Sequence, residues 1–227
     1  MAPSLPPPLP WPDGEFRLAA GFWSPAEADA LFAQLSAQLA WSRHGVRLFG
    51  RELPAPRLSA WHGDAAASYR YSGIRHAPQP WTPALRAVRE RLAAALGFDF
   101  NGVLGNLYRD GADAMGWHSD DEPELGPDPV IASASFGAPR RFALRHRASG
   151  RREVLELGHG SLLLMAGASQ RCWQHGLPRT ARPCAPRINL TFRQVRPLAA
   201  NERAGVSGRA VRAMDMVGAD NAAGARP

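Results

Sequence analysis

The sequence contains no lysine, only two cysteines and no long apolar run. No segment approaches the roughly 18 consecutive apolar residues of a membrane-spanning helix, so we expect no membrane contact. Cys172 and Cys184 do not form a C-x-x-C pair, which argues against a disulfide framework and against a cysteine zinc site. The first residues lack the basic and apolar pattern of a signal peptide, so the expected compartment is the cytoplasm.

All 27 basic residues of the 227-residue chain are arginine, and the formal net charge is +7. An excess of positive charge favours a polyanionic partner such as nucleic acid. On charge alone, a protein that is merely basic explains the composition equally well.

The length predicts one folded domain with two tails. Residues 1–14 are rich in proline, and we expect them to form a disordered tail. Residues 15–198 form the predicted folded unit, with helices and hairpins in 15–100 and strands in 101–198. Residues 199–227 are rich in alanine and glycine without a sustained apolar period, so a second disordered tail is expected.

Two helices are predicted before a series of strands. A capping box starts the first helix at Ser24, and the second starts at Thr82 and ends near Gly97. Short apolar runs then alternate with glycine, proline and aspartate clusters, which is typical of a sandwich or barrel. The predicted strands are Val103–Tyr108, Val130–Phe136, Arg141–His146, Glu153–Leu157, Ser161–Met165, Cys172–Gly176 and Arg187–Val195. The expected fold class is mainly β with flanking helices, braced by the two N-terminal helices.

Polar residues recur at every second position in two of these strands. Side chains two apart in a strand share a face. Asn106 and Tyr108 form one such pair, and the last strand alternates polar Arg187, Asn189, Thr191 and Arg193 with apolar Ile188, Leu190 and Phe192. The apolar face must pack on a core, so the arginine face lines either an anion-binding cavity or solvent.

His118 and Asp120 form a third pair at this spacing, and His175 lies on a later predicted strand. Two histidines and one carboxylate make the facial triad of non-haem Fe(II) oxygenases. Zinc in hydrolytic enzymes also takes three such ligands, so spacing alone does not settle the metal.

The whole ordered set resembles the AlkB family of Fe(II)- and 2-oxoglutarate-dependent dioxygenases, most closely its members that act on duplex DNA. The resemblance covers residues 47–195. Its motifs are Asn106-Leu107-Tyr108, His118-Ser119-Asp120-Asp121-Glu122, Ala132-Ser133-Ala134-Ser135-Phe136-Gly137, His159-Gly160-Ser161-Leu162 and the strand from Arg187 to Arg193. The resemblance implies a double-stranded β-helix, or jelly roll, in residues 101–198.

The resemblance also implies the cofactors and their residues. His118, Asp120 and His175 bind Fe(II), which works with 2-oxoglutarate as cosubstrate and with O₂. The distal carboxylate of 2-oxoglutarate is held by Asn106, Tyr108 and Arg187. Arg193, helped by Asn189, lies near the carboxylate that chelates the metal, and Thr191 lines the same pocket. Arginine suits this task because its fork binds a carboxylate bidentately.

Two segments resemble the parts of the family that handle the nucleic acid. Phe49, Gly50 and Arg51 match a finger that enters the base stack, although a hairpin phenylalanine packed on the core explains them equally well. Arg57, Tyr69, Tyr71 and Ser72 match a nucleotide-recognition lid, and an ordinary hairpin with exposed tyrosines is the alternative. Asp121 follows the metal ligand and contacts substrate by resemblance, or belongs to a solvated acidic turn.

The implied activity is direct-reversal DNA repair. N-alkylated bases such as 1-methyladenine and 3-methylcytosine are hydroxylated at the methyl group, and formaldehyde, succinate and CO₂ are released. The expected partner is alkylated DNA, single- or double-stranded, and the expected state is a monomer. The same chemistry on RNA and a catalytically silent nucleic-acid binding module remain open alternatives.

Overall fold

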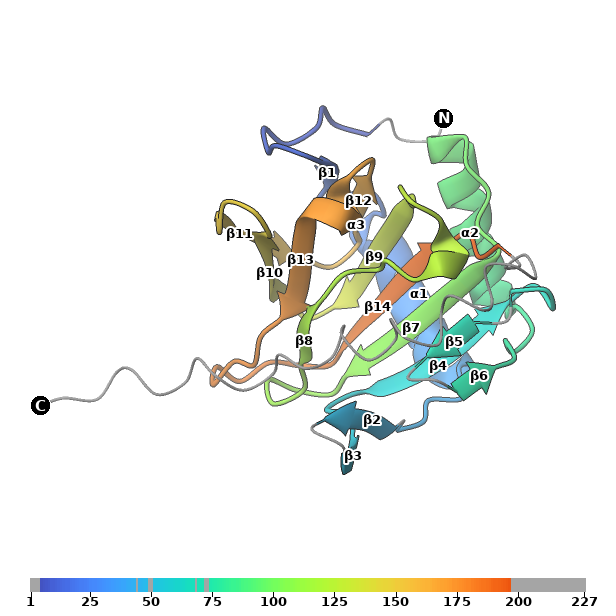
Figure 1. Ribbon diagram of the computed structural model, residues 1–227. Helices are drawn as coiled ribbons and strands as arrows, with labels where there is room; N and C mark the ends of the chain where they lie inside the picture. Colours follow the sequence, from blue (N-terminus) through green and yellow to red (C-terminus); the bar gives the residue numbers. More distant parts are fainter. Residues whose placement is uncertain (1–4, 44, 49–50, 68, 72–73, 197–227) are drawn as a thin grey trace, which may run out of the picture.

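Two antiparallel β-sheets face each other in the computed structural model of the chain (Figure 1). The structure describes residues 5–43, 45–48, 51–67, 69–71 and 74–196. The larger sheet has the order β1 (Glu15–Ala19), β12 (Ser161–Ala166), β9 (Ile131–Gly137), β14 (Arg187–Arg193), β7 (Gly102–Tyr108) and β4 (Leu58–Gly63). The smaller sheet has the order β11 (Arg152–Leu157), β10 (Arg140–His146), β13 (Trp173–Leu177) and β8 (Met115–His118). This two-sheet arrangement confirms the predicted jelly-roll class.

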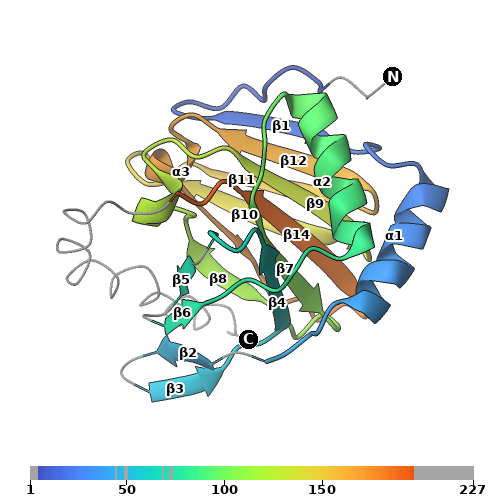
Figure 2. The same ribbon diagram turned by 90° about the vertical axis from the view of Figure 1, so that its right-hand side faces the viewer.

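Helices α1 (Pro25–Gln38) and α2 (Pro83–Leu96) cover the outer face of the larger sheet (Figure 2). The predicted signals act as expected: Ser24 caps α1 in a complete capping box, Thr82 caps α2, and Gly97 ends α2 in a left-handed conformation with φ 63°. The buried face of α2 joins the apolar side chains of β14 in one core. Burial of each such side chain stabilises the fold by about 1.5–3 kcal/mol. Packing of the two helices therefore holds the apolar face of β14 in place.

A second core fills the space between the two sheets. Phe16, Leu163 and Met165 come from the larger sheet, and Leu144 and Trp173 come from the smaller one. This second core packs the two sheets against each other beside the strands that carry the polar residues. The short elements η1 (Pro123–Leu125) and α3 (Ser169–Cys172) lie in the connections after β8 and after β12. No helix in the described parts of the chain is long and apolar enough to cross a membrane.

Two hairpins lie beside the β4 edge of the larger sheet in both views (Figures 1 and 2). The first pairs β2 (Gly45–Leu48) with β3 (Arg51–Pro54), and the second pairs β5 (Tyr69–Tyr71) with β6 (Ile74–His76). These are the segments predicted to be the finger and the lid. The finger tip at Phe49 and Gly50 and the lid residue Ser72 lie outside the described residues.

The predicted N-terminal tail is wrong for residues 5–14. Trp11 packs against Phe16 and Trp173, with ring centroids 5.1 and 5.8 Å apart, and the Trp173 indole donates a hydrogen bond to the Pro12 carbonyl at 2.9 Å. Proline content is typical of a flexible tail, but the aromatic side chain of Trp11 gives this segment a place on the domain. Residues 199–227 lie outside the described range.

Candidate metal centre and ligand pocket

The two predicted histidine ligands come together on neighbouring strands of the smaller sheet. His118 ends β8 and lies opposite His175 on β13, with their ring centroids 4.3 Å apart. Asp120 lies beyond the end of β8, so it does not share a strand with His118. Potential ligand atoms of His118, Asp120 and His175 nevertheless all lie within 4.8 Å of one another. The loop conformation, rather than strand alternation, brings the carboxylate to the histidines.

Hydrogen bonding prepares His118 to bind a metal ion. Its Nδ1 lies 2.8 Å from the carbonyl oxygen of Gly116. A carbonyl only accepts, so Nδ1 carries the hydrogen and Nε2 keeps its lone pair for a ligand bond. His175 is held differently, because its ring stacks against Phe142 at a centroid distance of 5.2 Å. Two neutral imidazoles and one carboxylate fit Fe(II), and the donor set does not by itself exclude other divalent metals.

The electrostatics of the triad favour the protonation states that a metal requires. Burial lowers the pKa of both histidines, that of His175 to about 3, since the neighbouring His118 disfavours a second positive charge. Burial opposes ionisation of Asp120, but the charge of Arg193 and its hydrogen bond favour the carboxylate and lower the pKa of Asp120. Arg193 also donates a hydrogen bond to Asp120 Oδ1 at 2.6 Å. The triad therefore consists of neutral imidazoles and an ionised carboxylate.

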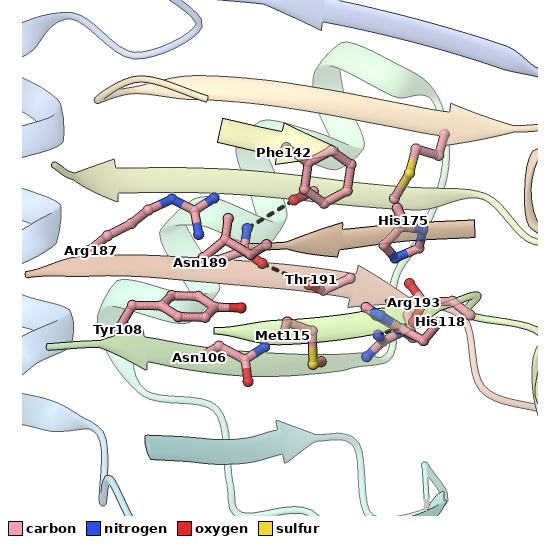
Figure 3. Close-up of a pocket in the computed structure, with 14 residues that line it drawn as sticks. Asn106, Tyr108, Met115, His118, Phe142, His175, Arg187, Asn189, Thr191 and Arg193 are labelled. Atoms are coloured by element: carbon pink, nitrogen blue, oxygen red, sulfur yellow. Dashed lines mark hydrogen bonds and ion pairs between the residues drawn. The ribbon is translucent and has the colours of Figure 1, made fainter. Parts of the chain in front are cut away.

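A pocket between the sheets opens beside this triad (Figure 3). The polar face of β14 forms its floor, and all four predicted residues there are at most 9% exposed. The alternate residues Ile188, Leu190 and Phe192 are fully buried on the helix side. The prediction that this strand has an apolar face on a core and a polar face on a cavity is confirmed. The pocket is lined by Asn106, Tyr108, Met115, His118, Asp120, Ser133, Phe142, Met165, His175, Leu177, Arg187, Asn189, Thr191 and Arg193.

Arg187 provides the test of whether this pocket fits a dicarboxylate. Its side chain is 2% exposed, and Nη2 donates to Ser135 Oγ at 2.8 Å, while Nε has no hydrogen-bond partner. No carboxylate among the described residues forms an ion pair with it. Burial lowers its pKa to about 10, and the Tyr108 ring lies 5.4 Å from the guanidinium carbon. A buried cation without a counter-ion is costly, so the pocket is suited to an anionic ligand such as 2-oxoglutarate.

Asn106 and Tyr108 lie on β7, in register with Asn189 and Arg187 on β14. Asn106 Oδ1 accepts hydrogen bonds from Arg57 Nε at 2.9 Å and from Ser59 Oγ at 3.2 Å. With its oxygen engaged, the amide nitrogen of Asn106 is available as a donor in the pocket. Both residues line the same pocket as Arg187, and their role in binding a carboxylate stays a prediction.

The side chains of Asn189 and Thr191 form hydrogen bonds with other groups of the larger sheet. Asn189 Nδ2 donates to Ser133 Oγ at 2.8 Å and to the Ala134 carbonyl at 3.0 Å, and its Oδ1 accepts from Thr191 Oγ1 at 3.2 Å. The donor hydrogens of Asn189 are thus used within the sheet. This arrangement favours a role for both side chains in shaping the pocket wall over direct donation to a carboxylate.

Arg57 occupies a different position from the one expected for a lid residue. It is 4% exposed, and its guanidinium lies against Asn106 and the Ala114 carbonyl. The structure therefore connects Arg57 to Asn106, one of the residues predicted to bind 2-oxoglutarate. Of the other predicted substrate residues, Arg51 is the first residue of β3, and Tyr69 and Tyr71 are the first and last residues of β5. Asp121 is half-exposed and follows the predicted metal ligand Asp120.

Sequence reasoning missed Arg140. Its guanidinium donates to three carbonyl oxygens, those of Asp110, Asp113 and Pro178, at 2.8–2.9 Å, and lies 5.9 Å from the Tyr108 ring. Arg140 is 4% exposed, and its hydrogen bonds connect the loop after β7 to the segment after β13. The only sequence signal was an arginine at the edge of a predicted strand, which has no distinguishing pattern.

Comparisons with known proteins agree with this geometry. The family model described as "2OG-Fe(II) oxygenase superfamily" matches residues 15–193. The DNA oxidative demethylase ALKBH2 of Mus musculus is 45% identical over 183 residues, which cover 76% of this chain and 77% of the relative. The alpha-ketoglutarate-dependent dioxygenase alkB homolog 3 of Homo sapiens is 43% identical over 188 residues, covering 78% and 65% of the two chains.

A solved structure supports the fold alone. The structure titled "The structure of OsALKBH1" superposes with a TM-score of 0.58 at 19% identity, covering 79% of this chain and 97% of that chain. The family model and the sequence relatives, which agree with the triad and the pocket, identify the family of the chain. It belongs to the 2OG-Fe(II) oxygenase superfamily and, within it, to the AlkB family of Fe(II)- and 2-oxoglutarate-dependent dioxygenases.

Proposed function

We propose that this dioxygenase removes N-linked methyl groups from damaged DNA bases such as 1-methyladenine and 3-methylcytosine. The observation that carries the proposal is the buried pocket in which the His118, Asp120 and His175 triad adjoins Arg187, a cation that pairs with no carboxylate among the described residues. Relatives with 42–45% identity are named DNA oxidative demethylases, which supports DNA as the substrate. The excess of arginine is consistent with a polyanionic partner.

His118, Asp120 and His175 would hold the iron in this proposal. Bound Fe(II) and 2-oxoglutarate supply the O₂ activation that oxidises the methyl group, with release of succinate and CO₂. The hydroxymethylated base then loses formaldehyde without a protein nucleophile. The task of this chain's residues is therefore to position the cosubstrate and to exclude water from the reacting centre.

Arg187, Tyr108 and Asn106 would bind the distal carboxylate of 2-oxoglutarate. Arg187 offers an unpartnered Nε, and the register of β7 and β14 places Tyr108 opposite it. Arg193, already paired with Asp120, would lie beside the carboxylate that chelates the metal. Asn189 and Thr191 would form the wall between these two ends, since they bond to each other and to β9.

The substrate base must leave the helix stack to reach a buried metal. Tyr71 and Tyr69 on β5 would stack on or line the pocket for this base, with Ser72 beside them, and Arg51 on β3 would contact phosphate. Phe49 and Gly50, between β2 and β3, would supply the wedge. Asp121 would accept a hydrogen bond from the exocyclic amine, because it adjoins the metal ligand and is half-exposed. Arg57 would affect substrate binding only indirectly, because it stabilises Asn106 in the pocket wall by a hydrogen bond.

We further propose that residues 15–198 form one catalytic unit, that it acts as a monomer, and that it works in the cytoplasm. The continuous larger sheet, which joins β1 to β14, supports a single unit. Sedimentation of the full chain, with and without a methylated oligonucleotide, tests the monomer. A dimer present without DNA contradicts it.

Substrate-stimulated turnover tests the proposed function. The full chain is incubated with Fe(II), ascorbate and 2-oxoglutarate, and succinate is measured with no nucleic acid, with a 3-methylcytosine DNA oligonucleotide and with the same oligonucleotide as RNA. We expect the strongest stimulation by methylated DNA. A clear preference for RNA overturns the DNA assignment, and absence of stimulation by either overturns the demethylase proposal. Absence of any succinate would favour the catalytically silent binding module.

A further inference from the structure

The loop that carries Asp120 is held by a buried glutamine from another element. Gln170 lies in α3, between β12 and β13, and is 1% exposed. Its Oε1 accepts a hydrogen bond from the backbone N–H of Asp120 at 2.9 Å, across 50 positions of sequence. Its Nε2 lies 3.7 Å from Met165 Sδ and 3.4 Å from Ser169 Oγ. The amide is thereby oriented with its oxygen toward the metal ligand's backbone.

The neighbouring residue of the loop is fixed to the same region. Ser119 Oγ donates to the Trp173 carbonyl at 2.7 Å, and Arg147 Nη2 donates to Ser119 Oγ at 2.9 Å. The segment from α3 to the start of β13 thus holds two consecutive residues of the loop. His175 lies two residues after Trp173 on that segment, so the same short stretch positions two of the three proposed ligands.

Asp120 needs such a support because β8 ends at His118. Beyond that residue no strand pairing fixes the backbone, and the carboxylate is drawn toward Arg193 by the ion pair at 2.6 Å. A side chain tethered only at its carboxylate could follow the guanidinium away from the histidines. A hydrogen bond at the backbone N–H fixes the position from which the carboxylate extends.

We propose that Gln170 is a positioning residue that sets the metal affinity of the triad through the backbone of Asp120. The inference rests on the proposed assignment of the metal to His118, Asp120 and His175. Residues that orient metal ligands typically change metal affinity by about 10- to 100-fold when they are replaced. Loss of the glutamine oxygen also leaves a buried N–H without an acceptor, which favours a shifted loop.

The test measures binding of Co(II), a redox-stable probe whose absorption reports its ligand set, to the full chain without nucleic acid. Gln170→Met keeps an unbranched side chain of similar length and removes the acceptor. We expect it to weaken Co(II) binding by about 10- to 100-fold and to alter the absorption spectrum. Gln38→Met is the matched control, since Gln38 Oε1 also accepts a backbone N–H, that of Ala84 at 3.4 Å, at the end of α1 and away from the Asp120 loop. It should bind Co(II) as the wild type does.

His118→Ala separates failure of this inference from failure of the metal assignment. If His118→Ala weakens Co(II) binding and a folded Gln170→Met does not, the role of Gln170 is wrong and the triad stands. If His118→Ala also binds normally, the metal assignment itself is wrong.

A measurement on the wild type covers the case in which Gln170→Met does not fold. Amide hydrogen exchange reports the bond between the Asp120 N–H and Gln170 directly. We expect the Asp120 amide to be protected in the native protein. Exchange at the rate of an unstructured peptide would overturn the inference without any variant.

Discussion

Arg187 shows how the burial of a single charged side chain indicates the class of ligand that suits its pocket. The sequence predicted a cavity-facing arginine from alternation alone, and burial of the whole polar face confirms that orientation. What alternation could not predict was that Nε would have no partner. Charge without a counter-ion is unfavourable in a buried site, so the pocket is less stable than a well-packed apolar one until an anion binds.

Arg187→Met should therefore separate binding from stability. We expect the Kd for 2-oxoglutarate to rise roughly 30-fold or more, because truncating one partner of a buried charge pair costs about 2–5 kcal/mol. The free energy of unfolding without 2-oxoglutarate should fall little or rise. Titration with 2-oxoglutarate in the presence of Mn(II) and urea unfolding measure the two quantities. Arg182→Met, at an exposed arginine, should change neither, and an unchanged Kd in Arg187→Met contradicts the assignment.

The buried histidines make stability depend on pH. Burial lowers the pKa of His62, His118 and His175 in the folded protein, that of His175 to about 3, whereas the unfolded value is about 6.5. Between those values the unfolded chain binds more protons, so stability rises with pH in this window and is lost as pH falls below about 6.5. The lowered pKa of Asp120 acts in the same direction at lower pH.

Urea midpoints between pH 7 and 5 measure this dependence on metal-free protein. We expect the midpoint to fall as the pH falls, and to fall less steeply in His175→Asn, which lacks one of the buried imidazoles. The same slope in both proteins would show that His175 does not contribute.

At the scale of elements, strong local patterns were sufficient for the two long helices and for the strands that follow α2, except β8. The capping box at Ser24 and the alternation in β14 each combine several agreeing signals within a few residues. β1 was missed because its five residues follow the proline-rich segment and pair with β12, almost 150 positions later. β8 was missed because Met115–His118 has no apolar alternation and pairs only with β13. Long-range pairing determines both strands.

The same limit applies to the site. Motif spacing predicted the triad and the arginine row, because the ligands proposed for them demand those residue types. Gln170, Arg140 and the true position of Arg57 could not be found this way. Their roles arise from contacts between elements that are far apart in sequence, and their residue types are common at unrelated positions.

The cap of α1 offers a prediction at this scale. Ser24 Oγ accepts from the Glu27 N–H at 3.4 Å, and Glu27 Oε2 accepts from the Ser24 N–H at 2.8 Å. We expect Ser24→Ala to lower the free energy of unfolding by about 1 kcal/mol. Ser36→Ala, in the same helix but away from the cap, should change it by less than about 0.5 kcal/mol. Chemical unfolding measures the free energy of unfolding of both variants. Equal losses in Ser24→Ala and Ser36→Ala would contradict the capping role of Ser24.

At the scale of the whole molecule, the arginine excess should govern encounter with DNA. Each phosphate that arginine neutralises releases counterions, so log Kd should rise with log salt by about 0.9 per contact. We expect binding of a methylated oligonucleotide, measured by anisotropy with Mn(II) and 2-oxoglutarate, to weaken steeply between about 50 and 200 mM salt. An unmethylated oligonucleotide should show a similar slope at lower affinity. Binding that ignores salt contradicts a phosphate interface.

We infer that the triad and the Arg187 pocket act together to oxidise a methyl group on DNA. Mass spectrometry of a 3-methylcytosine oligonucleotide, incubated with the full chain, Fe(II), ascorbate and 2-oxoglutarate, follows this reaction. We expect loss of one methyl mass with the wild type and no loss with His118→Ala. If 2-oxoglutarate is consumed while the methyl group stays, the iron site is right and the substrate is wrong. If folded, iron-loaded wild type leaves both 2-oxoglutarate and the methyl group unchanged, the chain is not a demethylase of DNA.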